Sequence, residues 1–428
     1  MLGLVTVISM AGLMILGAPI AVALGGSGLI TLLASGNFSA IKTFPQRMFG
    51  AVDSFPLMAV IFFIVAGELM LQGGMSKRLV RLVNYFLARV RGSLAYISLV
   101  TSAFFGALSG SSLATTSAIG SIMYPEMLED GTYDKSFGVA VMATGGTLGT
   151  MIPPSIPIVI FGMLANTSIG DMMLALIPAG ILVTIFYCLA AFFVIKKRNM
   201  ATKKHKQSDS FIKVFINAVP ALLTPLIILG GIYTGVFSPT ESAAIACVYA
   251  LIIGVFFYRE LTINAIVRAL RNSAKATASI MFLCAAAGFL GWVLTFEGIM
   301  GSATGFLMKS INSPFTFFLF ANIAYFIAGM FVDTATVQFL LTPLLFQVGR
   351  VIPGINMIHV GIVACINLSL GAITPPFGAC MFVANGLDKS VRVEEIYKEV
   401  IPFIVAGIIG IAVLSAFPQT IMFMVPKR

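Results

Sequence analysis

The chain has 428 residues, of which 59% are hydrophobic and 10% are charged, and its mean hydropathy is +1.02. These values exclude an ordinary soluble domain, in which about 25% of residues are charged. The net charge of +10 is concentrated in short clusters that flank apolar segments. We therefore predict an all-α polytopic membrane protein in the lipid bilayer and no nucleic-acid binding.

The first half, residues 1–197, is predicted to cross the membrane five times. Its segments, in chain order, are two short helices at about 2–17 and 19–35, a helix at 55–73, an interrupted apolar stretch at about 93–128, a broken helix at about 135–165 and a final span at 171–195. The stretch at 93–128 is interrupted at Ser109-Gly110-Ser111-Ser112. The helix at 135–165 is broken by Gly149 and the Pro153-Pro154 pair.

The interrupted stretch is expected to be a re-entrant helical hairpin. Each of its arms has about 15 residues and covers about 22 Å at a rise of 1.5 Å per residue. The hydrocarbon core of a bilayer is about 30 Å thick, so each arm is too short to cross it. A hairpin that enters and leaves on one side leaves an odd number of crossings in this half.

The second half, residues 212–428, repeats this order after a linker at 198–211. Gly149 and its Pro-Pro pair recur 222 residues later as Gly371 and Pro375-Pro376. The matching segments are 215–236, 240–258, 276–296, a hairpin at about 313–347, a broken helix at about 357–386 and a last span at 397–424. Halves with an odd number of crossings point in opposite directions, so we predict two inverted repeats, as in many transporters.

Charge gives an independent prediction of orientation. Basic residues cluster at 77–91, 196–213 and 259–275. Because positive charge marks cytoplasmic loops, we assign these segments and the linker to the cytoplasm and both termini to the outside. Cations alternate with apolar residues at 77–91 and 259–275, which predicts helices lying on the cytoplasmic membrane surface.

The broken helices are the candidate functional site. A break exposes backbone amides at one half-helix end, which attract anions, and carbonyls at the other, which bind cations. Small and hydroxylated residues gather at each break, and the second hairpin also contains Asp333. An acid inside a membrane hairpin is a functional hypothesis, but Asp333 is equally placed to cap the following helix. Close packing is the alternative explanation of the glycines and serines.

The sequence contains no P-loop, metal-ligand cluster or nucleophile–histidine–acid set. We therefore expect no catalytic residues, no organic cofactor, no metal other than Na⁺, and neither an ATP-driven pump nor an enzyme.

The motifs from Gly106 to Ser112, from Gly149 to Pro154 and from Gly371 to Pro376 resemble those of the large membrane subunit of tripartite ATP-independent periplasmic (TRAP) transporters, the DctM-like family. The resemblance covers essentially the whole chain. It implies an elevator-type secondary transporter, with a scaffold and a transport domain, in a bacterial inner membrane with periplasmic termini. It also implies sodium-coupled import of an organic acid such as sialic acid or a C4-dicarboxylate.

The resemblance implies two partners, a soluble periplasmic substrate-binding protein and a small four-helix membrane subunit. This chain contains no additional four-helix segment, so the small subunit is expected to be a separate polypeptide. The alternatives are a self-contained sodium/dicarboxylate symporter, a passive channel with re-entrant filter loops, and an intramembrane enzyme, for which Asp333 has no evident partner.

The resemblance also implies two sodium sites, made largely of backbone carbonyls. The first would use Ser109, Ser111, Gly149, Ile152 and Pro154, and the second Asp333, Thr334, Thr336, Gly371, Thr374 and Pro376. The candidate substrate residues between the hairpin tips are Ser111, Ser112, Thr115, Thr147, Asp333 and Ser369. Neither broken motif contains Arg or Lys, so helix N-termini, hydroxyls or the small subunit would have to bind a carboxylate.

Overall fold

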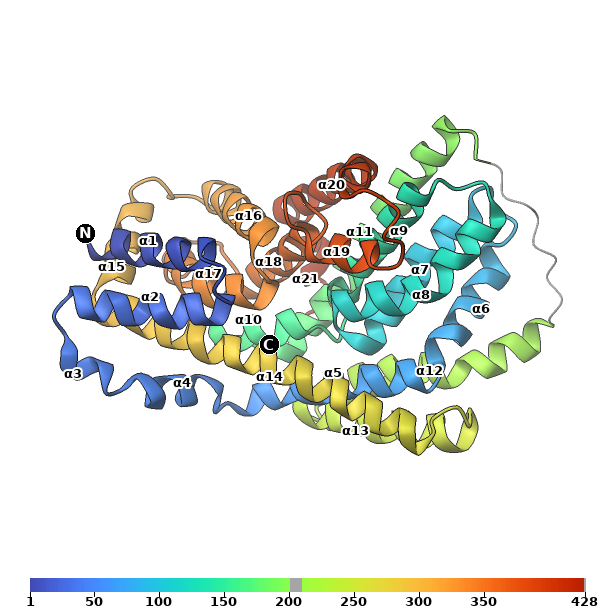
Figure 1. Cartoon of the computed structure of the whole chain (residues 1–428), viewed down its shortest axis with the longest axis horizontal. Helices are drawn as coiled ribbons and strands as arrows, with labels where there is room; N and C mark the ends of the chain where they lie inside the picture. Colours follow the sequence, from blue (N-terminus) through green and yellow to red (C-terminus); the bar gives the residue numbers. More distant parts are fainter. Residues whose placement is uncertain (201–209, 427–428) are drawn as a thin grey trace.

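The computed structural model describes residues 1–200 and 210–426, and every regular element in this part of the chain is a helix (Figure 1). The predicted all-α polytopic class is therefore confirmed. Most of the predicted linker 198–211 lies outside the described residues, and the division into 1–197 and 212–428 stays a prediction.

The helices of the first half follow the expected order. They are α1 (Leu2–Ile15), α2 (Ile20–Ala34), α3 (Phe38–Ile41), α4 (Phe44–Val52), α5 (Phe55–Gln72), α6 (Met75–Leu87), α7 (Ser93–Ser109), α8 (Ser112–Asp130), α9 (Lys135–Met151), α10 (Ile156–Leu164) and α11 (Ile169–Lys197).

The second half is likewise made of helices. They are α12 (Phe211–Tyr233), α13 (Pro239–Ile252) with its π-helical extension η1 (Ile253–Phe257), α14 (Ile263–Phe296), α15 (Ile299–Met308), α16 (Pro314–Phe331), α17 (Thr334–Gly349), α18 (Met357–Gly371), α19 (Ala379–Asn385), α20 (Val393–Ala416) and α21 (Gln419–Met422).

Seven of the described helices are long and apolar enough to cross a membrane. Helices α9 and α10, which are bent by 43° at their break, are together long and apolar enough to count as an eighth candidate. Helices α1 and α2 have 14 and 15 residues, or about 21–23 Å at 1.5 Å per residue, and neither alone matches a core of about 30 Å. The inverted orientation of the halves and the five crossings in each remain predictions.

Helix α14 differs from its expected form. A separate surface helix over 259–275 was predicted, but the helix runs without interruption from Ile263 to Phe296, so that boundary is wrong. Its counterpart in the first half is divided into α4 and α5 by Asp53 and Ser54, and Pro56 lies in the first turn of α5. The matching stretch of α14 is rich in alanine and contains no proline, so nothing stops the helix there.

Helices α4, α5, α12, α13 and α14 form one layer along the lower side of Figure 1, and the hairpins and broken helices lie above it. Helix α4 packs on the C-terminal part of α14. The ring of Phe44 meets that of Phe289 edge-on at 4.7 Å, and the guanidinium of Arg47 lies 4.6 Å from the centre of the Trp292 ring. Helix α4 of the first half and helix α14 of the second half thus hold each other in place.

Ion pairs join the two halves at the ends of α9 and α20. Lys135 at the start of α9 lies 3.3 Å from the carboxylate of Asp388, between α19 and α20. Arg198 after α11 lies 3.3 Å from Asp134 and 2.8 Å from Glu399 on α20. Arg198 lies in a segment that its charge assigns to the cytoplasm, and the other four residues lie at or near the ends of α9, α19 and α20. The network therefore ties together the helix ends that carry the broken motifs.

Asp388 is the most strongly hydrogen-bonded carboxylate of this network. Its oxygens accept hydrogen bonds from the Ser390 amide at 2.9 Å and from the Tyr124 hydroxyl at 2.9 Å, and Lys135 lies beside it. The bonds from Ser390, followed by those from Tyr124 and Lys135, hold the pKa of Asp388 below its usual range. The ionised carboxylate is therefore the form that stabilises the fold.

Replacing Asp388 by Asn is expected to lower the thermal stability of the purified protein near pH 7. Because the folded-state pKa is lowered, the stabilisation is fully present above the unfolded value of about 3.9 and is lost as pH falls through the folded value. The difference in melting temperature between wild type and Asp388→Asn, measured from pH 7 to pH 3, should therefore be constant above about pH 5 and shrink below about pH 4. Asp53→Asn removes an exposed carboxylate without an ion pair among the described residues and serves as the control. A pH-independent difference for Asp388→Asn would contradict the assignment.

Candidate functional site

The first hairpin turns at the residues that the sequence marks as a break. Helix α7 ends at Ser109, and Gly110 has a φ of +62°, which favours glycine. The Ser111 hydroxyl accepts a hydrogen bond from the Ala114 amide at 3.4 Å and caps α8. A glycine stop followed by a serine cap thus reverses the chain within two residues.

The tip of this hairpin lies against the break between α9 and α10. The Ile156 amide at the start of α10 donates to the Gly110 carbonyl at 3.3 Å. A Cβ atom added to Gly110 would lie 2.8 Å from the Pro154 carbonyl oxygen, and one added to Gly149 would lie 2.5 Å from that of Ser111. The structure therefore brings together most of the residues of the first predicted sodium site.

The side chains of Ser109 and Ile152, two residues of this set, make other contacts. The Ser109 hydroxyl is buried and lies 3.0 Å from that of Thr115. Ile152 has extended backbone after the end of α9, and its side chain lies near Gly180 of α11. Only the backbone of Ile152 is thus placed to act at the break.

The second hairpin turns in a different way. Val332 is extended, and the carboxylate of Asp333 accepts a hydrogen bond from the Ala335 amide at 3.0 Å, at the start of α17. The capping role of Asp333 is therefore observed. Before the turn, the backbones of Gly329 and Gly371 meet, and a Cβ atom on Gly371 would lie 2.8 Å from the Gly329 carbonyl oxygen.

The other residues of the second set are placed as follows. The Thr374 hydroxyl donates to the Leu370 carbonyl at 2.9 Å, and the Pro376 carbonyl accepts from the Tyr397 hydroxyl at 2.6 Å. Thr334 is the first residue of α17. The Thr336 hydroxyl is buried without a hydrogen-bond partner among the described residues. A buried hydroxyl of this kind has acceptor capacity available for an ion.

Gln338 also belongs to this region, although sequence analysis did not single it out. It lies on α17, one turn after Thr334, and is fully buried. Neither its amide oxygen nor its amide nitrogen has a hydrogen-bond partner in the described part of the chain. The available signal was a glutamine in the interior of an apolar helix, which has its second glutamine, Gln347, near its end.

A chain of hydroxyl groups connects two of the candidate substrate residues, Ser112 and Ser369, through Thr150. The Ser112 hydroxyl lies 2.8 Å from that of Thr150, which in turn lies 2.7 Å from that of Ser369. This chain joins the first hairpin, the first broken helix and the second broken helix. Thr150 was missing from the predicted set, although it follows Gly149 directly. Thr147 is directed elsewhere, because its hydroxyl lies 3.3 Å from that of Tyr187 on α11.

The half-helices that follow the breaks pack across the two repeats. Helix α19 of the second half packs against α8 and α9, and α10 of the first half packs against α17. The buried Cys380 lies on α19. Both candidate sets thus belong to one continuous core.

The oxygen atoms of this region suit a hard monovalent cation. The first set supplies hydroxyls and backbone carbonyls without a carboxylate, and the second adds Asp333. Carbonyl ends of interrupted helices bind Na⁺ in transporters of this architecture. The backbone at both breaks is approached so closely that only glycine fits at Gly149 and Gly371.

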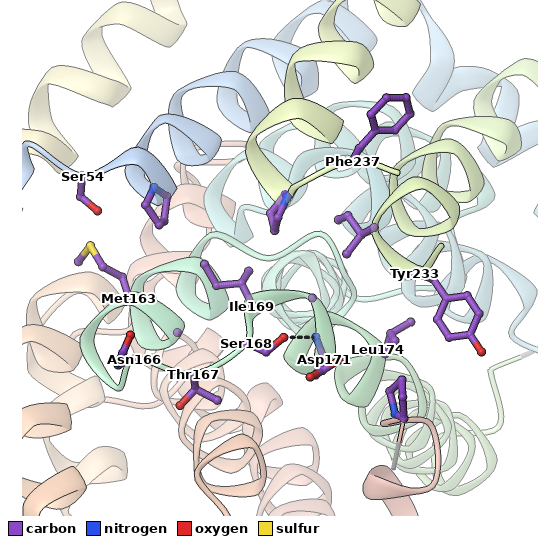
Figure 2. A pocket seen from close by; sticks show the side chains of 16 residues that line it. Ser54, Met163, Asn166, Thr167, Ser168, Ile169, Asp171, Leu174, Tyr233 and Phe237 are labelled. Carbon is purple, nitrogen blue, oxygen red and sulfur yellow. Dashed lines mark hydrogen bonds between the residues drawn. The ribbon is translucent and has the colours of Figure 1, made fainter. Parts of the chain in front are cut away.

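A cavity of about 520 Å³ lies away from the hairpin tips. Figure 2 shows Asn166, Thr167 and Ser168 in the loop before α11, with Tyr233 at the end of α12 and Phe237 between α12 and α13 on the other side. Its lining contains Asp171 and no Lys or Arg. A carboxylate placed there would be repelled by Asp171, so we place the candidate site at the breaks.

Comparison with known proteins agrees with this architecture. The family model described as "Tripartite ATP-independent periplasmic transporter, DctM component" matches residues 7–420. The isethionate TRAP transporter permease protein DctMQ of Oleidesulfovibrio alaskensis is 35% identical over 96% of this chain, which spans 64% of that protein's length. The sialic acid TRAP transporter large permease protein SiaM of Vibrio cholerae is 31% identical over 95% of both chains.

A solved structure has the same fold. The YdaH transporter of Alcanivorax borkumensis, whose structure is described as having an unusual topology, superposes with a TM-score of 0.64. The match covers 91% of this chain and 90% of that one at 16% sequence identity. The similarity therefore concerns the fold alone.

Replacing Gly371 by Ala is expected to destabilise the protein, because the added Cβ atom would lie 2.7 Å from the carbonyl carbon of Gly329. Inserting a methyl group into such a contact costs about 1–3 kcal/mol. Gly291→Ala in α14 is the matched control, since a Cβ atom there has no neighbour within 4 Å and alanine favours a helix by up to about 1 kcal/mol. Melting temperatures in detergent should fall for the first variant and stay equal or rise for the second. Equal shifts would show that the glycine contact carries no stability.

Proposed function

The chain belongs to the DctM component family of TRAP transporters, and from this premise we propose that it imports an organic acid into a bacterium together with Na⁺. It is a multi-pass permease, and its named relatives are permeases for isethionate and sialic acid, both of them organic acids. We propose the sialic acid or C4-dicarboxylate class as substrate.

The observation that carries the proposal is the hydroxyl chain of Ser112, Thr150 and Ser369. It lies where the first hairpin meets both broken helices, so a substrate bound there contacts both halves. Helix α8 begins at Ser112, and its free amides and dipole favour a carboxylate. Hydroxyl groups supply the remaining polar contacts for a hydroxylated acid.

Sodium fits the proposal because the oxygen atoms of the helix breaks lie next to the hydroxyl chain of Ser112, Thr150 and Ser369. Ser111 caps α8 beside Ser112, and its carbonyl faces Gly149 next to Thr150. A cation held there neutralises an approaching carboxylate and fixes the hairpin on the broken helix. Binding of ion and acid would thus be mutually favourable, which is the physical basis of coupling.

The partners follow from the same premise. We propose that a periplasmic binding protein delivers the acid, that a small four-helix subunit forms a separate chain, and that both termini lie in the periplasm. The interleaved broken helices would move as one body against the layer of α4, α5, α12, α13 and α14, which gives an elevator motion.

The proposal is tested by reconstituting this chain with the small subunit in proteoliposomes. Labelled sialic acid and succinate are offered with and without purified binding protein and a tenfold sodium gradient. With the membrane potential held at zero, the gradient is expected to sustain roughly tenfold accumulation per coupled ion, since about 1.4 kcal/mol corresponds to a factor of ten.

Each alternative has its own outcome. Accumulation without any binding protein would indicate a self-contained symporter. Ohmic currents in planar bilayers, with no accumulation, would indicate a channel. Uptake that is unaffected by replacing sodium with choline would refute sodium coupling.

The role of Asp333 is tested by replacing it with Asn or Ser. Both residues cap helices well, so they keep the bond to the Ala335 amide and remove only the charge. Uptake is expected to require at least about fivefold more sodium in both variants, which corresponds to the loss of about 1 kcal/mol of ion binding. The melting temperatures of the variants monitor the cap. An unchanged sodium dependence would leave Asp333 with the capping role alone.

A further inference from the structure

A second, smaller cavity lies between α6 and α12. It has a volume of about 300 Å³ and is lined by Arg78, Arg81, Lys213, Val214 and Asn217. It forms because Leu82 of α6 is buried against Val214 and Ala218 of α12, which sets the two helices side by side. None of the candidate sodium or substrate residues lines it.

The cations of this cavity are not equivalent. Arg78 is fixed by an ion pair with Glu260 at 2.9 Å and by a hydrogen bond to the Gly74 carbonyl at 2.9 Å. Its guanidinium also stacks 3.6 Å from the centre of the Tyr258 ring. Arg81 and Lys213 are exposed and form no ion pair among the described residues. The cavity therefore has a rigid cationic wall and two cations that are available to a ligand.

The first turn of α12 adds to this positive potential. Lys213 and Val214 lie in that turn, and the preceding Ser210 provides no side-chain cap. The first amides of a helix have no intrahelical acceptor, and the helix dipole is positive at this end. The cations of this cavity thus lie beside the N-terminal end of α12.

An exposed aromatic cluster adjoins the cavity. It consists of Tyr85, Phe86, Phe211 and Phe215, whose ring centres lie 5.2–5.8 Å apart in successive contacts. Phe86 and Phe215 are 62% and 43% exposed, and Ile216 on α12 is 55% exposed. Aromatic residues of this kind mark the boundary between headgroups and hydrocarbon. The surface is therefore cationic at one end and apolar along the next turns of α12.

We propose that this cavity binds the phosphate headgroup of an anionic phospholipid. Arg81 and Lys213 contact the phosphate, Arg78 forms the wall behind it, and the acyl chains lie along Phe215 and Ile216. An amphiphile with one negative headgroup matches both parts of this surface, and basic pockets between membrane helices bind such headgroups. Because α6 follows the candidate span α5 and α12 is itself a candidate span, the bound lipid would fix their junction at the membrane surface.

The test uses the purified full-length chain and native mass spectrometry, with dioleoyl phosphatidylglycerol as the anionic probe and dioleoyl phosphatidylcholine as the zwitterionic one. Wild type is expected to bind phosphatidylglycerol at least about tenfold more tightly than phosphatidylcholine. Arg81→Gln/Lys213→Gln should abolish that preference, and Lys213→Arg should keep it. The matched control, Arg268→Gln/Lys275→Gln, removes one Arg and one Lys from α14 and should leave binding unchanged within about twofold.

Four results would overturn the proposal. An equal loss in the control pair would mean that only total charge matters. Equal binding of the two lipids would mean that no anion site exists. Inorganic phosphate that protects the protein from thermal unfolding as well as the lipid does would assign the cavity to a free anion. If Arg81→Gln/Lys213→Gln keeps its lipid binding but no longer purifies with the small subunit, the cavity would be assigned to a protein partner.

Discussion

An interrupted helix inside a membrane leaves backbone amides and carbonyls without partners where no water is available. Each unpaired group costs several kcal/mol in hydrocarbon, so every break has to be covered by another part of the protein or by a ligand. Here the tip of the first hairpin covers the first break through the bond between Ile156 and Gly110. The half-helices after both breaks then pack on the opposite half. The interleaved core follows from the need to cover two breaks at once.

Covering an interrupted helix produces close backbone contact in both halves. Gly149 lies against the Ser111 carbonyl, and Gly371 lies against Gly329. At Gly371 the neighbouring atoms all belong to the Gly329 backbone, whereas at Gly149 the Thr115 side chain lies beside the Ser111 carbonyl. Each contact places a carbonyl oxygen of one helix against the glycine of another. A packing explanation and a binding explanation of these glycines are therefore compatible, because close approach is what gathers the oxygens.

Local chemistry explains which features could be predicted from the sequence. The positions of both hairpins and both breaks follow from Gly, Ser and Pro, which act on the backbone within one or two residues. The hydroxyl chain could not be read in this way, since the choice of Thr150 over Thr147 depends on how α9 is rotated against α11 and α18. The length of α14 was not predicted, because the alternation of its cations with apolar residues is typical of a separate surface helix. No residue near Lys275 ends the helix, so it continues to Phe296. Gln338 shows no periodic pattern and becomes visible only through its burial.

The uninterrupted α14 also bears on how the protein sits in its membrane. Its 34 residues extend for about 51 Å, far more than the thickness of the hydrocarbon core of about 30 Å. Arg268, Arg271 and Lys275 mark the part that belongs in the headgroup region, and the stretch from there to Phe296 is about 31 Å long. That remaining stretch matches the core with almost no excess, so α14 has little freedom to tilt. A bilayer a few ångströms thinner would either expose apolar side chains or incline the whole helix, together with the α4 and α5 arm bound to it.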